Sequence, residues 1–86
     1  MHDHLTDAII KRIDLPTKGN RITYDDDVAG FGIRVTAGGA RSFILNYRTK
    51  AGRERRITIG QFPNWKAVSA RQEARRARRL TEGETH

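Results

Sequence analysis

Cysteine is absent from this chain of 86 residues, and so is any long apolar run. Without cysteine, neither disulfide bonds nor a thiolate metal site can support the fold, which fits a reducing cytosol. No segment approaches the roughly 20 apolar residues of a membrane span, and residues 1–14 lack the apolar centre of a signal peptide. We therefore expect a soluble cytoplasmic protein that does not bind membranes. A chain this short supports one small core, so a deep active site is not expected.

Motifs of catalysis and metal binding are also missing. The sequence contains no Ser/His/Asp set, no paired carboxylates suited to catalysis and no phosphate-binding loop. Asp25, Asp26 and Asp27 are consecutive, and consecutive residues in an extended chain do not converge on one ion, so we expect a turn there instead. His2 and His4 have no third ligand in view. We predict no catalysis, cofactor, metal site or small-molecule substrate.

Negative charge is scarce in the second part of the chain. Residues 1–30 carry four basic and six acidic side chains, whereas residues 31–86 carry thirteen basic and four acidic ones, and the net charge of the whole chain is +7. Arginine outnumbers lysine thirteen to four, which favours forked contacts to phosphate groups and base edges. This distribution predicts a polyanionic partner, and it favours nucleic acid over a merely solubilising basic surface.

The stretch 30–60 alternates apolar and polar residues in three short runs, which are separated by turns that contain glycine. Such alternation is typical of half-buried strands, and glycine supplies the positive φ angles of tight turns. The side chains expected to face the core are Phe31, Ile33, Val35, Phe43, Leu45, Tyr47, Ile57 and Ile59. The side chains expected on the opposite face are Arg34, Thr36, Ser42, Ile44, Asn46, Arg48, Glu54, Arg56 and Thr58.

Two helices are expected beside these strands. Thr6 can cap a short helix that begins at about Asp7. Residues 66–80 are rich in alanine and arginine, and their small residues recur at helical spacing, so this helix can lie close against the sheet with the stem of Arg71 along apolar surface. The predicted fold class is α+β: a small antiparallel three-stranded sheet packed against a C-terminal helix, with 21–25 as an optional short edge strand.

Four segments of the chain carry a resemblance to a known family. They are LTDAIIKRIDLP, DDDVAGFGIRVTAGGARSFILNYR, GRERRITIGQFPNW and SARQEARR. In this order and spacing the sequence resembles the N-terminal arm-type DNA-binding domain of phage and genomic-island integrases, which are tyrosine recombinases. The match runs from Leu5 to about Gly83, so we expect residues 1–86 to form one such domain with its core at 5–83.

The resemblance implies a function and a cellular context. In these integrases the exposed face of the sheet enters the major groove of double-stranded DNA at arm-type sites, and the catalytic residues lie in a separate domain. The chain is therefore expected to be a non-catalytic part of a protein for DNA integration and site-specific recombination, such as a prophage enzyme that integrates a viral genome. Its expected partners are arm-site DNA in the bacterial cytoplasm and other domains or subunits of the same integrase.

Alternation and turn positions then give each polar residue an expected role. Residues of the polar sheet face are expected to contact base edges, where arginine can read guanine and asparagine can read adenine. These are Arg34, Thr36, Ser42, Asn46, Arg48, Arg56 and Thr58. Residues in or beside the turns are expected to contact phosphates without reading sequence. These are Arg41, Lys50 and Arg53, with Arg55 less clearly placed at the rim. Ile44 is expected to contact a thymine methyl group or to pack against the N-terminal segment.

Two other functions stay open at the level of sequence. A small sheet backed by a helix also occurs in RNA-binding modules, although here the alternation turns Phe31, Phe43 and Tyr47 inward, away from base stacking. The second alternative is a protein-interaction module whose helix docks onto acidic partners or integrase subunits through Arg75, Arg76 and Arg79. Competition between duplex DNA and RNA of matched sequence would test the first alternative. Charge reversal on the helix, compared with replacement of Arg34 and Arg48, would test the second.

Overall fold

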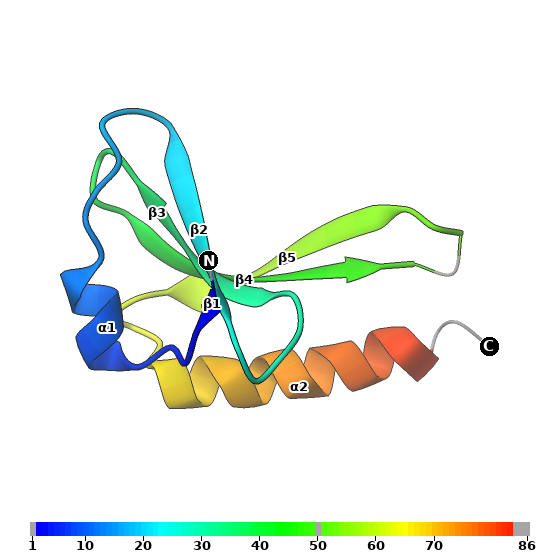
Figure 1. Cartoon of the computed structure of the whole chain (residues 1–86). Helices are drawn as coiled ribbons and strands as arrows, with labels where there is room; N and C mark the ends of the chain where they lie inside the picture. The colour runs from blue at the N-terminus through cyan, green and yellow to red at the C-terminus, as the bar shows by residue number, and fades with distance from the viewer. Residues whose placement is uncertain (1, 50, 84–86) are drawn as a thin grey trace.

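A computed structural model describes residues 2–49 and 51–83, with side chains described for 4–49 and 51–80. It contains two helices and five strands, arranged in the chain order drawn in Figure 1. Their bounds are β1 His2–Asp3, α1 Asp7–Arg12, β2 Asn20–Asp25, β3 Phe31–Thr36, β4 Arg41–Arg48, β5 Glu54–Gln61 and α2 Ala67–Gly83. None of the helices in these described stretches is long and apolar enough to cross a membrane.

The strands form one sheet in the order β1-β2-β3-β4-β5. The four strands β2 to β5 are antiparallel, and the two-residue β1 is parallel to β2. The prediction of an α+β fold with an antiparallel sheet and a C-terminal helix is confirmed. The prediction of three strands is wrong in number, because β2 pairs along its length with β3, from Asn20↔Thr36 to Tyr24↔Gly32. The optional edge strand is thus a full member of the sheet.

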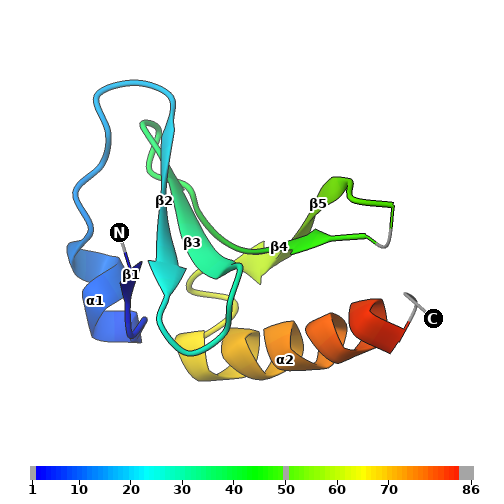
Figure 2. The same ribbon diagram turned by 45° about the vertical axis from the view of Figure 1, so that its right-hand side comes forward.

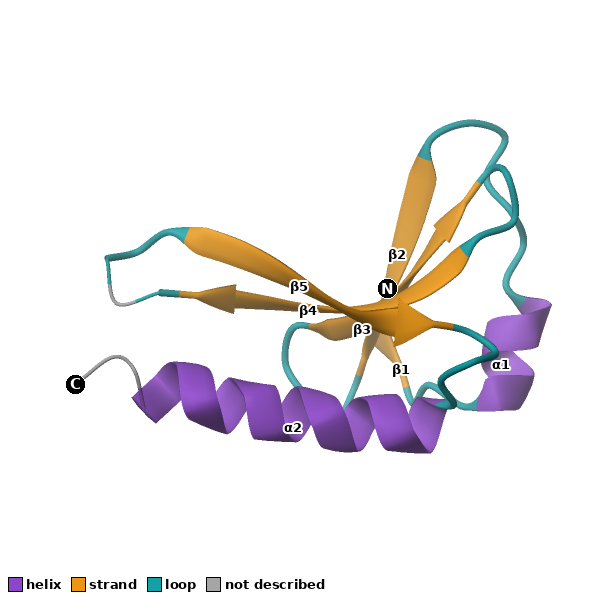
Figure 3. Ribbon diagram, turned by 180° about the vertical axis from the view of Figure 1, so that it is seen from behind, coloured by secondary structure: helices purple, strands orange, loops and turns teal. Residues whose placement is uncertain are grey.

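The core lies between the sheet and α2, which runs along one face of it (Figure 3). Phe31, Ile33 and Phe43 are fully buried on this face, as the alternation predicted. The rings of Phe31 and Phe43 stack with their centroids 5.8 Å apart. The small residues of α2 that contact the core are Ala67, Ala70, Ala74 and Ala77. Because alanine has so short a side chain, α2 can approach the sheet closely enough to exclude water from these rings.

Helix α1 closes one edge of the core. Thr6 caps it as predicted, with its Oγ1 accepting a hydrogen bond from the backbone N–H of Ile9 at 3.2 Å. Ile10 is fully buried in the core cluster. The first turn of α1 also caps the other helix, because Oδ1 of Asp7 accepts a hydrogen bond from the backbone N–H of Ala67 at 2.8 Å. One acidic residue therefore joins the N-terminal ends of both helices.

The sheet bends sharply where β4 meets β5. Phe43 pairs with Gly60 and Ile44 pairs with Thr58, so Ile59 is an extra residue, a bulge in β5. A bulge of this kind bends its strand and increases the local twist. Beyond the bend, residues 46–48 of β4 and 54–56 of β5 continue past the end of β3 as a two-stranded segment, which we call the distal ribbon. Figures 1 and 2 show it diverging from the β2–β3 hairpin.

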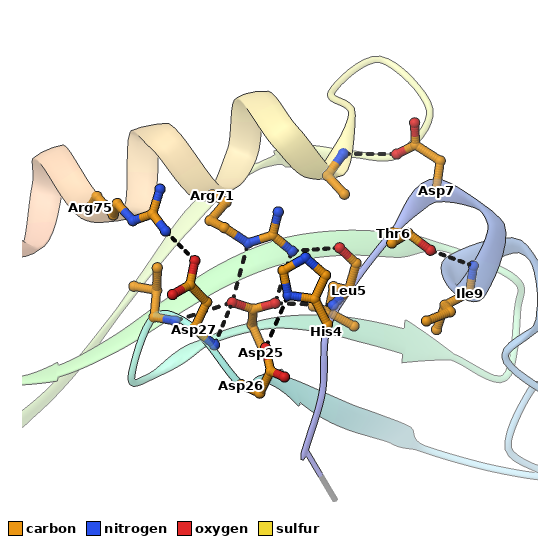
Figure 4. Close-up of polar contacts among 12 residues, drawn as sticks. His4, Leu5, Thr6, Asp7, Ile9, Asp25, Asp26, Asp27, Arg71 and Arg75 are labelled. Carbon is orange, nitrogen blue, oxygen red and sulfur yellow. Dashed lines mark hydrogen bonds and ion pairs between the residues drawn. The ribbon is translucent and has the colours of Figure 1, made fainter.

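A buried ion pair connects α2 to the end of β2. Asp25 and Arg71 are 2% and 7% exposed, and their closest charged atoms are 2.9 Å apart (Figure 4). Asp25 Oδ2 also accepts hydrogen bonds from the backbone N–H groups of Asp27 and Val28, which confirms the predicted turn. The guanidinium of Arg71 donates to the carbonyl oxygen of Leu5 as well. Arg71 is therefore an internal anchor, and the prediction that it merely lies along apolar surface is incomplete.

Candidate nucleic-acid interface

The sheet face opposite α2, which neither helix covers, is called here the open face (Figure 3). The register places on it alternate residues of four strands. They are Ile22 and Tyr24 of β2, Gly32, Arg34 and Thr36 of β3, Ser42, Ile44, Asn46 and Arg48 of β4, and Glu54, Arg56 and Thr58 of β5. All the residues predicted to contact base edges lie on this face. The contacts themselves stay a prediction.

An aromatic ring covers the centre of the open face. Gly32 has no side chain, and a Cβ built there would lie 3.2 Å from Cδ1 of Tyr24, so the Tyr24 ring lies over this glycine. Ile44, the β4 partner of Gly32, is 0% exposed. The expected thymine contact is therefore wrong for Ile44, because a side chain with no accessible surface cannot reach a base. The alternation within β4 could not predict the burial of Ile44, because it gives no information about the Tyr24 ring that β2 places over Gly32.

A chain of side-chain hydrogen bonds crosses the open face beside Ile44. Arg56 Nε donates to Oδ1 of Asn46 at 2.9 Å, and Asn46 Nδ2 donates to the hydroxyl of Tyr24 at 2.8 Å. These three side chains come from β5, β4 and β2. The arrangement joins β5 of the distal ribbon to β2 on the other side of the bend. It holds Asn46 and Arg56 of the distal ribbon in one defined position.

The tip of the distal ribbon carries an ion pair between two residues that are partners in the register. Arg48 Nη2 lies 3.4 Å from Oε1 of Glu54, and both side chains are largely exposed. An exposed pair at this distance contributes on the order of 0–1 kcal/mol. Arg48 can therefore leave Glu54 for a phosphate or a base at little cost.

A second group of predicted residues lies on the other side of the bend. Arg34 and Ser42 are partners across β3 and β4, and both are half-buried. Thr36 Oγ1 accepts a hydrogen bond from the backbone N–H of Ala40 at 3.1 Å, which closes the turn between these strands. The structure thus separates the predicted base-contacting residues into two groups, one on each side of the bend.

The residues predicted to contact phosphates have different surroundings. Arg53 is exposed in the turn of the β4–β5 hairpin. Lys50 lies outside the described residues. Arg41 lies on the core side of β4, where its Nε and Nη2 donate to the carbonyl oxygens of Ile10 and Ile13, each at 3.2 Å. This contact gives Arg41 a structural role at the C-terminal end of α1. A phosphate contact by Arg41 stays a prediction, with fewer N–H groups left to make it.

Several arginines of α2 have carboxylate partners. Arg75 pairs with Asp27, which is drawn in Figure 4. Arg76 donates to Glu73 through Nε at 3.1 Å and Nη2 at 2.6 Å. The hydrogen bond with Arg76 lowers the pKa of the Glu73 carboxyl below its ordinary value.

On the sheet, by contrast, no ion pair is found for Arg34, Arg53, Arg55 or Arg56 within the described stretches. Apart from the weak Arg48 pair, these arginines of the sheet therefore carry positive charge without a carboxylate partner.

One group of potential metal ligands occurs beside the buried ion pair. His4, Asp25 and Asp26 each place a ligand atom within 4.8 Å of the others. Both oxygens of Asp25 are already hydrogen-bonded to Arg71 or to backbone N–H groups, and His4 Nδ1 lies 3.0 Å from Asp26 Oδ1. These contacts explain the grouping without an ion, so it carries no metal proposal.

The family of the chain follows from a comparison with known protein families. Residues 5–85 match the family described as Arm DNA-binding domain. The chain belongs to this family. No curated protein matches the chain. Membership confirms the resemblance found in the sequence and makes DNA the partner of this arm DNA-binding domain.

In this arm DNA-binding domain, sequence reasoning missed two features of the interface. It left Tyr24 without a role, although residues 20–25 alternate in phase with the neighbouring strand. It also treated Asn46 and Arg56 as independent residues. A signal for their pairing was present, since the predicted hairpin places them close together on the same face. The link to Tyr24 joins residues 22 positions apart and had no local signal.

Proposed function

We propose that the domain binds double-stranded DNA in a sequence-specific manner by inserting the open face into the major groove at arm-type sites. There it positions an integrase of the tyrosine recombinase type for site-specific recombination. The observation that carries the proposal is a sheet face that neither helix covers, on which neighbouring side chains hold the guanidinium group of Arg56 in place.

The shape of the hairpin supports the proposal. The major groove of B-DNA is about 12 Å wide and admits a two-stranded β-ribbon. The distal ribbon extends beyond β3, so its open-face side chains can enter a groove without a collision between the third strand and the phosphate backbone. Arg53 at the hairpin turn is then placed near the backbone, where a phosphate contact fixes register. The two groups of open-face residues would contact successive parts of one site.

The arrangement of aromatic rings argues against the RNA alternative. Phe31 and Phe43 are fully buried, as predicted, so they cannot stack on bases. Tyr24 is the aromatic residue of the open face, and its hydroxyl is tied to Asn46 within the protein. The protein-interaction alternative is weakened by charge pairing, because two of its three arginines, Arg75 and Arg76, are already paired with carboxylates of the same chain.

The test begins with selection of a target from a pool of random duplexes, followed by fluorescence anisotropy with the selected duplex. We expect Arg34→Ala and Arg56→Ala each to weaken specific binding by about 1–3 kcal/mol and to relax base preference at one position. Amide signals of β3, β4 and β5 should shift on titration with this duplex, and an RNA of matched sequence should compete poorly.

The matched control is charge reversal on α2, at Arg75, Arg76 and Arg79. These variants should retain base preference, because α2 lies behind the sheet. If charge reversal on α2 abolished binding while Arg34→Ala and Arg56→Ala had no effect, the protein-interaction alternative would replace the proposal. Tight binding of the matched RNA would favour the other alternative.

A further inference from the structure

We infer that Asn46 is a positioning residue for Arg56, and that Arg56 is the residue of the distal ribbon that reads a guanine. The inference rests on the proposed function and deepens it. The sequence pattern suggested instead that asparagine would read adenine directly. The hydrogen bonds of the open face assign Asn46 a different task.

The chemistry of the two partners fixes the orientation of the Asn46 amide. The Nε–H of arginine can only donate, so the atom of Asn46 that faces it at 2.9 Å must be the carbonyl oxygen. The amide nitrogen then points to the Tyr24 hydroxyl at 2.8 Å and donates to it. Reading adenine requires the same oxygen and nitrogen as a pair. Each already makes one hydrogen bond within the protein, so the direction of the amide is set by Arg56 and Tyr24, and only one lone pair of the oxygen and one N–H remain.

Arg56 still has N–H donors with which it can contact a base. Its Nε is held by Asn46, and no other hydrogen bond of its guanidinium is found in the part of the chain that the structure describes. The two terminal nitrogens therefore form an unoccupied fork on an exposed side chain. Guanine presents two acceptors, N7 and O6, in the major groove, and an arginine fork fits both.

The two residues that position Arg56, directly or through each other, are themselves held by contacts with neighbouring strands. Asn46 lies opposite Arg56 in the register, and its own backbone N–H donates to the carbonyl oxygen of Gly30 at 2.8 Å. Tyr24, the second partner of Asn46, lies over Gly32. A long arginine side chain loses rotamer entropy when it binds, and prior restraint lowers that loss. Asn46 and Tyr24 thus prepare Arg56 for recognition before DNA arrives.

A double-mutant cycle tests this coupling on the duplex selected above. Arg56→Ala should weaken binding roughly ten- to hundredfold and remove the preference for one guanine. In the wild-type background, Asn46→Ala should weaken binding roughly tenfold and remove the same preference for guanine. In the Arg56→Ala background, Asn46→Ala should weaken binding by less than about twofold. Tyr24→Phe, which keeps the ring, should show the same pattern with a smaller loss.

Arg34 provides the matched control. Its partner Ser42 is four residues from Asn46 along β4, or about 13 Å at the usual rise of a strand. The effects of Arg34→Ala and Asn46→Ala should therefore be additive. A second readout needs no DNA. In the free protein, exchange of the Arg56 Nε–H with solvent should become faster in Asn46→Ala, while the amide spectrum of the variant remains that of a folded protein.

The outcomes separate this inference from the proposed function. Two outcomes would overturn the positioning role and leave sequence-specific DNA binding intact. One is additive losses of affinity for Asn46→Ala and Arg56→Ala, and the other is a changed preference at an adenine in Asn46→Ala. A uniform loss on all duplexes would also overturn it, because a merely structural role has that effect. If the wild-type protein selects no duplex sequence, the proposed function fails, and the inference fails with it.

Discussion

At the scale of single residues, Gly30 and Gly52 have the same φ angle in different surroundings. Both have a φ of 82°, a region that other residues rarely adopt. A Cβ at Gly52 would contact nothing within 4 Å, whereas a Cβ at Gly30 would overlap the backbone carbonyl of Asn46. Gly30 therefore permits a close approach of two backbones, and Gly52 permits only a turn.

We predict different losses of stability from the same substitution at these two sites. Gly52→Ala should lower the free energy of unfolding by about 1–2 kcal/mol, the cost of the left-handed conformation. Gly30→Ala should cost at least about 3 kcal/mol, because backbone atoms must also move apart. Urea denaturation measures both values. Equal losses at the two sites would show that the close approach at Gly30 is unimportant.

Asp25 makes the stability of the fold depend on pH. Burial by itself would raise its pKa, but the hydrogen bond from Arg71 and those from the backbone of Leu5, Val28 and Asp27 outweigh it and lower the pKa to about 2. Because the folded pKa is depressed below the ordinary value of 3.8, the stabilisation is fully present above pH 4. It is lost as the pH falls from about 4 to 2.

We predict that Asp25→Asn removes this pH dependence. The shift corresponds to about 2 kcal/mol at neutral pH, and loss of one partner of a buried ion pair can raise the total cost to about 3–5 kcal/mol. Denaturation curves from pH 7 to pH 2 should show the gap between wild type and Asp25→Asn narrowing below pH 4. Asp26→Asn, an exposed neighbour, is the control and should change stability by less than about 0.5 kcal/mol. A gap that stays constant with pH would contradict this account.

At the scale of secondary-structure elements, two contacts hold α1 to the rest of the domain besides its buried Ile10. Asp7 caps the N-terminus of α2, and Arg41 of β4 donates to two carbonyl oxygens at the C-terminal end of α1. A helix of six residues is too short to be stable alone. Its formation therefore depends on these long-range contacts, which no pattern within residues 7–12 could reveal.

We predict that Arg41→Ala lowers the stability of the free protein, in addition to any effect on DNA binding. Removing two hydrogen bonds to buried or half-buried carbonyl groups should cost about 1–3 kcal/mol of unfolding free energy. Arg34→Ala, on the open face, should stay within about 0.5 kcal/mol of wild type while it weakens DNA binding. Thermal or urea denaturation of the free proteins distinguishes the two. Unchanged stability in Arg41→Ala, together with weaker DNA binding, would restore the simpler role in which Arg41 binds a phosphate.

At the scale of the whole molecule, three arginines of α2 are paired with carboxylates, whereas several arginines of the open face are not. Acidic side chains at the end of β2, in the turn after it and in α2 itself pair with Arg71, Arg75 and Arg76 on the helix side. On the open face and in the turn of the β4–β5 hairpin, Arg34, Arg53 and Arg56 lack such partners among the described residues. The charge of these arginines is therefore available for the DNA contact proposed above.

We predict that the salt dependence of DNA binding distinguishes paired from unpaired arginines. The slope of log affinity against log salt changes by about 0.9 for each phosphate group that the protein no longer neutralises. Arg53→Ala should flatten the slope by about that amount on any duplex, whereas Arg76→Ala, whose charge is paired with Glu73, should leave it unchanged. Anisotropy titrations at several salt concentrations provide the measurement. A slope altered as much by Arg76→Ala as by Arg53→Ala would place DNA on the helix side as well.

The sequence by itself determined the faces of the sheet and the position of both helices. Period-two alternation set Phe31, Ile33 and Phe43 inward and Arg34, Asn46 and Arg56 outward, because neighbouring side chains on a strand must point to opposite sides. Capping and small-residue spacing likewise located α1 and α2, since these signals act within a few residues of the helix they define.

Only the tertiary structure decided which side chains meet. Arg71 and Asp25 are 46 residues apart, and Tyr24 and Asn46 are 22 apart. The bulge at Ile59 and the burial of Ile44 depend in the same way on strands that pack beside them. Such contacts form only when distant segments pack together, so local patterns do not encode them. For this reason the open face was predictable, while the support behind Arg56 was not.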